Sequence, residues 1–203
     1  MKSIIYNITV MFCDKLSNFG IIPAERKKVY IYGYELLLSS VVGIFCLMIL
    51  SGLIGKPFIW IPYLMGFVSL RITGGGYHAK SHWGCIVSFS IVFLILYAVG
   101  NSIYQATYVN VIFALFALGM AYFLAPVEAV NKPLKPENRR KNRRRCLAIS
   151  LFNAVFSWII LIAGIDGGFY VAMYFTGIFA AAISMIAALP GNRIKNGDRS
   201  VKK

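Results

Sequence analysis

The sequence predicts an all-α, polytopic membrane protein, and three observations support this prediction. The 203-residue chain is 59% hydrophobic with a mean hydropathy of +0.70, whereas soluble domains average about 45–50% apolar residues. The apolar residues gather in long runs, and the basic residues fall between the runs. Because a hydrocarbon core of about 30 Å needs roughly 20 apolar residues per helix, we expect six transmembrane helices. They correspond to residues 35–55, 57–70, 84–104, 106–126, 146–165 and 168–189.

Residues 1–34 come before the first apolar run and have the pattern of an amphipathic helix. Ile4, Ile8, Met11 and Phe12 recur at helical spacing, with polar residues elsewhere on the wheel. This pattern favours a helix lying in the membrane interface, and a cytosolic cap helix is the alternative. We expect one membrane-embedded domain over 1–203, with the bundle in 35–189 and a basic tail in 190–203.

The distribution of basic residues predicts the orientation of the chain in the membrane. With the N-terminus in the cytoplasm, six spans leave 1–34, 71–83, 127–145 and 190–203 on the cytoplasmic side. Of the 21 Lys and Arg residues, only Lys56 then lies outside, as the positive-inside rule requires. The net charge of +14 therefore belongs to membrane topology, and no nucleic-acid fold signature accompanies it. We expect a multi-pass protein with both termini in the cytoplasm.

The run 57–70 is short for a span, and the charge pattern decides its assignment. If this run did not cross, the strongest basic block, residues 132–145, would lie outside. We therefore expect it to cross, with local thinning of the bilayer. A short span leaves the segment that follows it close to the cytoplasmic membrane surface.

That segment, 71–85, reads RITGGGYHAKSHWGC and contains both histidines of the chain. Cys85 begins the next apolar helix, where free N–H groups and the helix dipole stabilise a thiolate. A thiolate is a nucleophile, and a nearby histidine is its usual base. The segment thus predicts a cysteine nucleophile on the cytoplasmic side, with Arg71 in support and Gly74, Gly75 and Gly76 as candidates for an oxyanion hole.

Spacing alone leaves the base and the chemistry open. On one continuous helix His78 and Cys85 would be about 10.5 Å apart along the axis, so their pairing requires non-helical backbone between them. His82 is three residues before Cys85 and is within reach on a helix. Two further alternatives are a packing cysteine and a zinc site formed by both histidines and Cys85. No fourth ligand lies nearby, so we expect no metal and no cofactor.

These residues resemble the accessory gene regulator protein B (AgrB) family. The shared pattern is an arginine, a glycine pair, a histidine and a cysteine seven residues later, here Arg71, Gly74–Gly76, His78 and Cys85. Chain length, the six apolar runs and the basic loop after the fourth span also match, so that the resemblance covers essentially the whole chain. His82 matches no family motif.

The resemblance implies a function, a partner and a location. AgrB-like proteins are cysteine endopeptidases of the bacterial plasma membrane that remove the acidic C-terminal tail of an AgrD precursor peptide. The resemblance assigns His78 as the base and Cys85 as the nucleophile, and it implies a homodimer. It also implies that an acyl-enzyme thioester is passed on to form a cyclic thiolactone or lactone signal in quorum sensing.

The basic loop after the fourth span has two readings that the sequence leaves equal. Its cations can attract an acidic substrate tail, or they can set the topology and bind anionic lipid of the bilayer. Lys132 and Lys135 look like the lysine- and proline-containing motif of the family. The candidates for tail binding are Lys132, Lys135, Arg139, Arg140, Arg143, Arg144 and Arg145.

Two other function classes remain as rivals. A transporter or peptide exporter usually has ionisable residues near the bilayer midplane, and none lies at the middle of any run here. A non-enzymatic membrane scaffold is the second rival. Loss of precursor cleavage on removal of Cys85 separates the enzyme from both.

Overall fold

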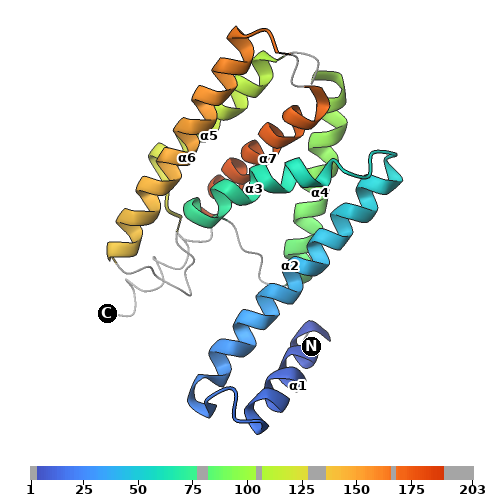
Figure 1. The fold of residues 1–203 in the computed structure, drawn as a ribbon, viewed down its shortest axis with the longest axis vertical. Coiled ribbons are helices and arrows are strands. Elements are labelled where there is room, and N and C mark those ends of the chain that lie inside the picture. Colours follow the sequence, from blue (N-terminus) through green and yellow to red (C-terminus); the bar gives the residue numbers. More distant parts are fainter. Residues whose placement is uncertain (1–3, 77–81, 104–106, 128–135, 166–167, 190–203) are drawn as a thin grey trace.

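In the computed structural model, the described parts of the chain form an all-α fold, as predicted (Figure 1). The described residues are 4–76, 82–103, 107–127, 136–165 and 168–189. Within these ranges the helices are α1 (Ile4–Asn18), the 3₁₀ turn η1 (Ala24–Arg26), α2 (Lys27–Leu53), α3 (Trp60–Gly74), α4 (His82–Ile103), α5 (Tyr108–Leu124), α6 (Pro136–Ile162) and α7 (Gly168–Ala187).

The six predicted spans correspond to the helices α2 to α7, but only three of these are clearly long and apolar enough to cross a membrane. They are α2, the Glu137–Ile162 part of α6, and α7. The apolar stretches Trp83–Ala98 and Tyr108–Leu124 are shorter, and α3 has 15 residues. A helix of that length spans only about 22 Å. The described residues thus show several apolar helices of a membrane protein, three of them full-length candidates for spans.

The helices pack in two groups. One group contains α3, α5, α6 and α7, the other contains α1, α2 and α4, and α7 connects them through its contact with α4. Helices α5, α6 and α7 run side by side, and α3 crosses α7 (Figure 1). Helix α5 packs on both α6 and α7, while α2 packs on α4 and on α1. The pair formed by α3 and α7 is the most extensive contact among the described helices, so it sets the position of the end of α3.

Two glycines allow α3 and α7 to cross at backbone contact. A Cβ on Gly66 would overlap the carbonyl oxygen of Tyr174, and a Cβ on Gly177 would overlap that of Tyr63. Each helix thus presents a glycine to the main chain of the other. Small residues are the usual means of close helix approach in membranes, where packing replaces the hydrophobic driving force.

An aromatic cluster joins α3 to α4. Tyr63 is fully buried, and its ring lies 5.0 Å from that of Phe93 between centroids. Phe67 and Phe89 lie one helical turn further along the two helices, with centroids 4.6 Å apart. Such tilted pairs contribute about 0.5–1.5 kcal/mol each beyond area burial. The cluster holds α4, and with it Cys85 in its first turn, against α3.

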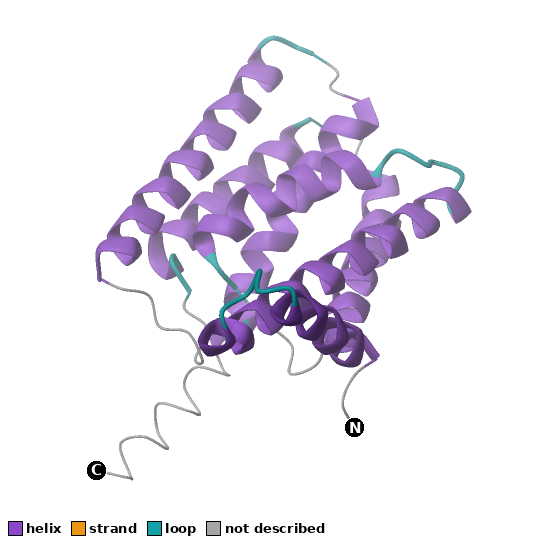
Figure 2. Cartoon of the chain, turned by 60° about the horizontal axis from the view of Figure 1, so that its bottom comes forward, coloured by secondary structure: helices purple, strands orange, loops and turns teal. Residues whose placement is uncertain are grey.

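At the N-terminal end, α1 folds back against the first half of α2 as a helical hairpin. Figure 2 brings this end forward and shows the connecting loop in teal. An Asp14–Lys27 ion pair joins the two helices, and the rings of Phe12 and Tyr34 meet edge to face at 5.2 Å. Cys13 is buried, and burial raises the pKa of its thiol, with Asp14 acting in the same direction and Lys27 against it.

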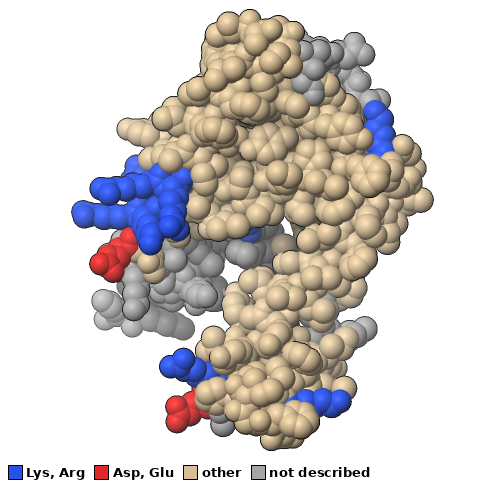
Figure 3. All heavy atoms as spheres, in the orientation of Figure 1, with Lys and Arg blue, Asp and Glu red and all other residues tan. Residues whose placement is uncertain are grey.

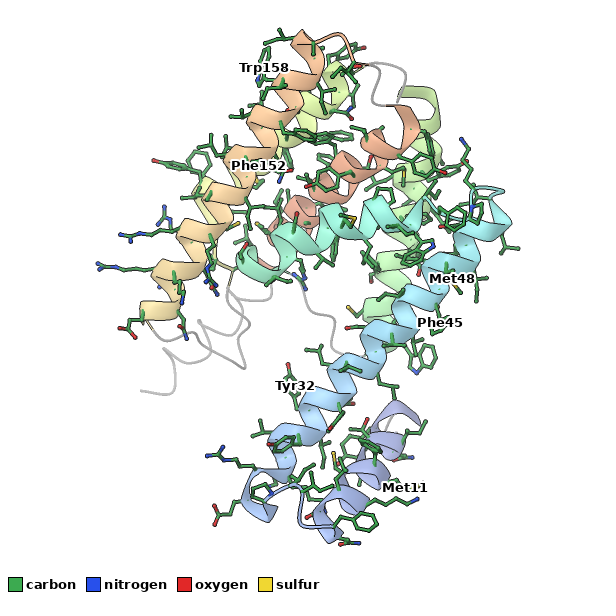
Figure 4. The ribbon with its side chains drawn as sticks, in the orientation of Figure 1. Met11, Tyr32, Phe45, Met48, Phe152 and Trp158 are labelled. Carbon is green, nitrogen blue, oxygen red and sulfur yellow. The ribbon has the colours of Figure 1, made fainter. Side chains whose placement is uncertain are left out.

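The choice between an interfacial helix and a cytosolic cap for α1 stays open. Large apolar side chains of the hairpin are exposed, including Met11 (67%) and Tyr32 (54%), both labelled in Figure 4. Such a surface suits a membrane interface, whereas the antiparallel packing of α1 on α2 suits a cap.

The glycine crossing gives a first prediction. Gly177→Ala forces the main chains of α3 and α7 apart, and overpacking of this kind costs about 1–3 kcal/mol. Thermal unfolding in a zwitterionic detergent should show a lower midpoint for this variant. Gly119→Ala on α5 is the matched control, because a Cβ there meets nothing within 4 Å, and alanine favours a helix over glycine by up to about 1 kcal/mol. Equal midpoints for the two variants would contradict the crossing.

Candidate functional site

The end of α3 turns through two glycines whose backbone angles exclude other residues. Gly75 has φ of 73° and ψ of −149°, and Gly76 has φ of 135°. L-residues rarely adopt these conformations, while glycine does so without steric cost. This accounts for two of the three consecutive glycines and makes the chain leave α3 abruptly towards the segment that precedes α4.

The residues after α5, 125–127, pack against this turn, and we call them the strap. The Val127 N–H donates a hydrogen bond to the Gly74 carbonyl at 2.8 Å, and Gly75 and Val127 form an isolated parallel β-bridge. A Cβ on Gly75 would overlap the Val127 carbonyl oxygen. The last carbonyls of a helix lack partners within the helix, so the strap satisfies one of them and fixes the end of α3.

The buried side of the turn packs on α6 and α7. A Cβ on Gly74 would overlap the Met185 methyl group and come within 3.1 Å of the Cys146 sulfur. Cys146 is fully buried, and its thiol forms a side-chain hydrogen bond with Thr73. Ser150 donates to the Cys146 carbonyl at 2.9 Å. Cys146 is therefore a packing residue of the bundle.

Arg71 occupies the other side of the turn, beneath Gly76. A Cβ on Gly76 would overlap a guanidinium nitrogen of Arg71 and lie 2.6 Å from the Ser184 hydroxyl of α7. The φ of 135° at Gly76 and the main chain of Ser184, 3.2 Å from such a Cβ, are what favour glycine at this position. The Arg71 guanidinium also interacts electrostatically with the Cys85 thiol. Arg71 thus lies at the meeting point of α3, α4 and α7.

Cys85 is the fourth residue of α4, in the first turn as the sequence predicted. All four cysteines are free; Cys85 is exposed, whereas Cys13 and Cys146 are buried and Cys46 is partly buried. Among the four, Cys85 combines exposure, a helix N-terminus and a nearby cation. This combination is typical of nucleophilic cysteines.

The histidines are not placed by the described residues. His78 lies in 77–81, outside the described part of the chain, and the side chain of His82 is likewise not described. Helix α4 begins at His82, so His82 and Cys85 share its first turn at i and i+3. Among the described residues, no group of three His, Cys, Asp or Glu side chains could hold a metal ion.

Comparison with known proteins identifies the family. The sequence model of the family described as Accessory gene regulator B matches residues 7–189. The chain belongs to this family. "Putative AgrB-like protein 2" of Clostridium perfringens (strain 13 / Type A) is 27% identical over 167 residues, covering 77% of this chain and 78% of that protein. "Putative AgrB-like protein" of Clostridium perfringens (strain SM101 / Type A) is 25% identical over the same length and shares. No solved structure matches.

Family membership places the protein in the agr quorum-sensing system, and the resemblance predicted from the sequence is confirmed. The roles that the AgrB pattern gives to Cys85 and His78 remain predictions. The structure does show the contacts of the three glycines that were predicted as oxyanion-hole candidates. The Gly75 N–H donates to the Arg71 carbonyl at 3.1 Å, so this N–H is already used in the structure, and the contacts of Gly74, Gly75 and Gly76 are those of close packing.

The basic residues predicted to bind a substrate tail point in different directions on α6. Arg143 donates to the Tyr122 carbonyl of α5 at 3.3 Å, so it holds the two helices together. Arg140, Arg144 and Arg145 line a shallow hollow together with Glu137 and Lys141. Arg139 is exposed in the first turns of α6, and Lys132 and Lys135 lie outside the described residues.

Sequence reasoning missed the residues that surround the turn. Val127, Cys146 and Ser184 are 51, 70 and 108 positions from Gly76 in the chain, and no motif connects them to it. The one available signal was the number of glycines in a row. Three consecutive glycines at the end of an apolar helix indicate close approach of several other segments.

The placement of Arg71 gives a second prediction. Arg71→Gln removes the cation that interacts electrostatically with Cys85; because a neighbouring cation generally favours an anionic form, alkylation of Cys85 by iodoacetamide at pH 7.5 should slow. The rate is measured by mass spectrometry of the Cys85 peptide in the detergent-purified protein. Arg71→Lys should retain most of the rate. An unchanged rate in Arg71→Gln would show that the guanidinium does not act on this thiol.

Proposed function

We propose that this AgrB-family chain is a membrane cysteine endopeptidase that removes the C-terminal tail of an AgrD-like precursor peptide. The observation that supports it is the Cys85 thiol, which is exposed in the first turn of α4 and interacts electrostatically with Arg71. The whole chain, 1–203, acts as one membrane-embedded domain. Cys85 is the nucleophile and His78 its base, with His82 as the local alternative.

The chemistry requires only groups of the chain and the precursor. Histidine accepts the Cys85 proton, and the thiolate attacks the carbonyl carbon of the scissile peptide bond. The carbon–nitrogen bond breaks, the tail amine leaves with the proton from the imidazolium, and the precursor fragment remains as a thioester on Cys85. Arg71 stabilises negative charge on the thiolate and on the tetrahedral oxyanion. No cofactor takes part in these steps.

The thioester then has two fates. Water hydrolyses it, or a cysteine or serine side chain of the precursor attacks it and releases a cyclic thiolactone or lactone. Exchange between two thioesters is nearly balanced in energy, so that ring formation needs no nucleotide. Shielding of the site from water favours the ring. The turn of Gly75 and Gly76, packed against Val127 and Ser184, provides one shielded side.

The positions of the charges support the proposed orientation in the membrane. Figure 3 shows Lys and Arg gathered over the N-terminal half of α6 and over the α1–α2 end. Lys56 lies in the turn between α2 and α3, and its ammonium nitrogen lies 3.9 Å from the centre of the Phe169 ring near the start of α7. We propose six spans in all, with both termini and Cys85 at the cytoplasmic side and Lys56 outside.

The buried polar groups favour the enzyme over a transporter. The Tyr174 hydroxyl of α7 donates to the Asn153 side-chain oxygen of α6 at 2.8 Å, and Asn153 donates to the Ile149 carbonyl at the same distance. These groups satisfy one another inside the bundle, which is how polar residues join membrane helices. They do not form an ionisable site of the kind that transporters use.

Mutation of the cysteines tests the proposed function. The full chain in bacterial membranes, coexpressed with an AgrD-like precursor, should convert the precursor to its shortened form, and Cys85→Ala should lower conversion below detection. Cys46→Ala should leave conversion unchanged, because that residue is on α2 and outside the site. Full cleavage by Cys85→Ala, or loss of peptide export with cleavage intact, would refute the peptidase and favour the exporter.

The same assay assigns the base. His78→Ala should reduce cleavage by about 10²–10⁴-fold, the usual contribution of a general base, while His82→Ala retains most of it. The reverse order would give the role to His82. Equal activity of both variants with the wild type would mean that the helix terminus and Arg71 alone activate the thiol.

Labelling from outside tests the orientation. A membrane-impermeant maleimide added to intact bacterial cells should modify Lys56→Cys and should fail to modify Lys141→Cys, because the two positions lie at opposite ends of the proposed spans. Both should react after the cells are permeabilised. Labelling of Lys141→Cys in intact cells would reverse the proposed topology.

A further inference from the structure

Helix α6 has two faces with different composition. The inner face holds Cys146, Ser150, Asn153 and Ser157, each with 0–1% of its surface exposed. This face packs on α5 and α3, and Asn153 accepts a hydrogen bond from Tyr174 of α7. The outer face points away from these helices, and its residues follow at helical spacing from the first turn of α6 to the last.

The outer face of the first turns is strongly basic. Each of its exposed residues lies three or four positions from another, as expected for one face of a helix. Together they line one shallow hollow. Arg143 is not part of it, because it bonds to the Tyr122 carbonyl on α5. We call this surface the outer basic face; it comprises Glu137, Arg140, Lys141, Arg144 and Arg145.

The same stripe continues as an apolar surface without a covering helix. Phe152 and Trp158, both labelled in Figure 4, are 66% and 46% exposed, and Ile162 at the end of α6 is 80% exposed. This part of α6 is one of the three full-length candidate spans. Large apolar side chains exposed on a membrane span face the lipid tails. They are Leu151, Phe152, Val155, Trp158, Ile159 and Ile162.

The length of the apolar stripe on α6 matches the thickness of the hydrocarbon core, which leaves the outer basic face at one membrane surface. From Arg145 to Ile162 the helix rises about 26 Å at 1.5 Å per residue, close to the roughly 30 Å of the hydrocarbon core. When the apolar stripe lies in the hydrocarbon, the outer basic face lies at the level of the lipid phosphates. Four cations and one carboxylate on that face then meet the negative surface potential of the inner leaflet.

We propose that the outer basic face binds anionic phospholipid, with the lipid phosphate held by Arg140 and Arg144 and the acyl chains lying along the apolar stripe. Arginine suits this ligand, because its planar group binds phosphate oxygens in pairs. An acidic precursor tail is the less suitable occupant. The outer basic face points away from α3 and α7, whereas the tail is cut from a peptide bond held at Cys85, next to Arg71.

The lipid site is independent of the proposed cleavage, and its test does not rely on activity. The full-length protein, purified in a neutral detergent, is titrated with phosphatidylglycerol or phosphatidylcholine, and bound lipids are counted by native mass spectrometry. The wild type should prefer phosphatidylglycerol. The variant Arg140→Gln/Arg144→Gln/Arg145→Gln should lose at least about tenfold of that preference, since each basic residue near an anionic surface contributes substantially.

Two matched variants control for charge and folding. Lys15→Gln/Arg26→Gln/Lys28→Gln removes the same charge from the exposed α1–α2 end and should keep the preference. Arg140→Lys/Arg144→Lys/Arg145→Lys should keep part of it. All variants should unfold at the wild-type temperature in lipid-free detergent, because the replaced side chains are exposed.

Three results would overturn the lipid site. The first is an unchanged phosphatidylglycerol preference in the outer-face variant, and the second is an equal loss of that preference in the α1–α2 variant. The third is that the outer-face variant, compared with the wild type, loses binding to a synthetic acidic tail peptide in lipid-free detergent. The last result would make the precursor tail the occupant of the outer basic face. Failure of precursor cleavage by the wild type would refute the peptidase and leave the lipid result intact.

Discussion

The hydrogen bond from the Val127 N–H to the Gly74 carbonyl is the contact on which the arrangement of the site depends. It joins the end of α3 to the strap after α5 at 2.8 Å, and it forms only because Gly75 lets the two main chains touch. Once the strap is in place, Gly74 packs on Cys146 and Met185, and Gly76 covers Arg71 and approaches Ser184. Segments from α3, α5, α6 and α7 are thereby fixed around one short turn.

The turn places a cation beside a thiol that stays accessible. The aromatic cluster of Tyr63, Phe67, Phe89 and Phe93 holds α4 against α3, so the start of α4 is positioned relative to the end of α3. Cys85 lies at that start, exposed, while Cys146 on the other side of the turn is buried. The fold thus separates a buried structural sulfur from an exposed one.

The sequence predicted the helices better than their lengths, and the position of Cys85 at a helix start better than the surroundings of that helix start. Apolar runs located α2 to α7 because burial in lipid demands continuous hydrophobicity. The short run 57–70 corresponds to the 15-residue α3, but the run 106–126 could not show that α5 would have only 17 residues. Cys85 was predicted from its place before an apolar helix. The approach of Gly76 to Arg71 and Ser184 could not be predicted, because it depends on a helix crossing set by Gly66 and Gly177.

The basic residues illustrate the same limit. The block 139–145 is one run of charge in the sequence, yet the period of α6 sends its members to different neighbours. Arg143 bonds to α5, while Arg140, Arg144 and Arg145 face outward. Charge alone predicts only that these residues lie on the same side of the membrane. The face of α6 on which each residue lies decides whether it contacts another helix, as Arg143 does, or belongs to the surface that we propose meets lipid.

The most direct test of the account is to trap the covalent intermediate. The wild-type chain in bilayers is mixed with a precursor whose ring-forming cysteine or serine is replaced by alanine, and the reaction is quenched with acid at successive times. Intact-mass spectrometry should show the protein gaining the mass of the acyl fragment, hydroxylamine should remove it, and peptide mapping should place it on Cys85. Release of the tail with the protein mass unchanged at every time, or an adduct on another residue, would contradict the account.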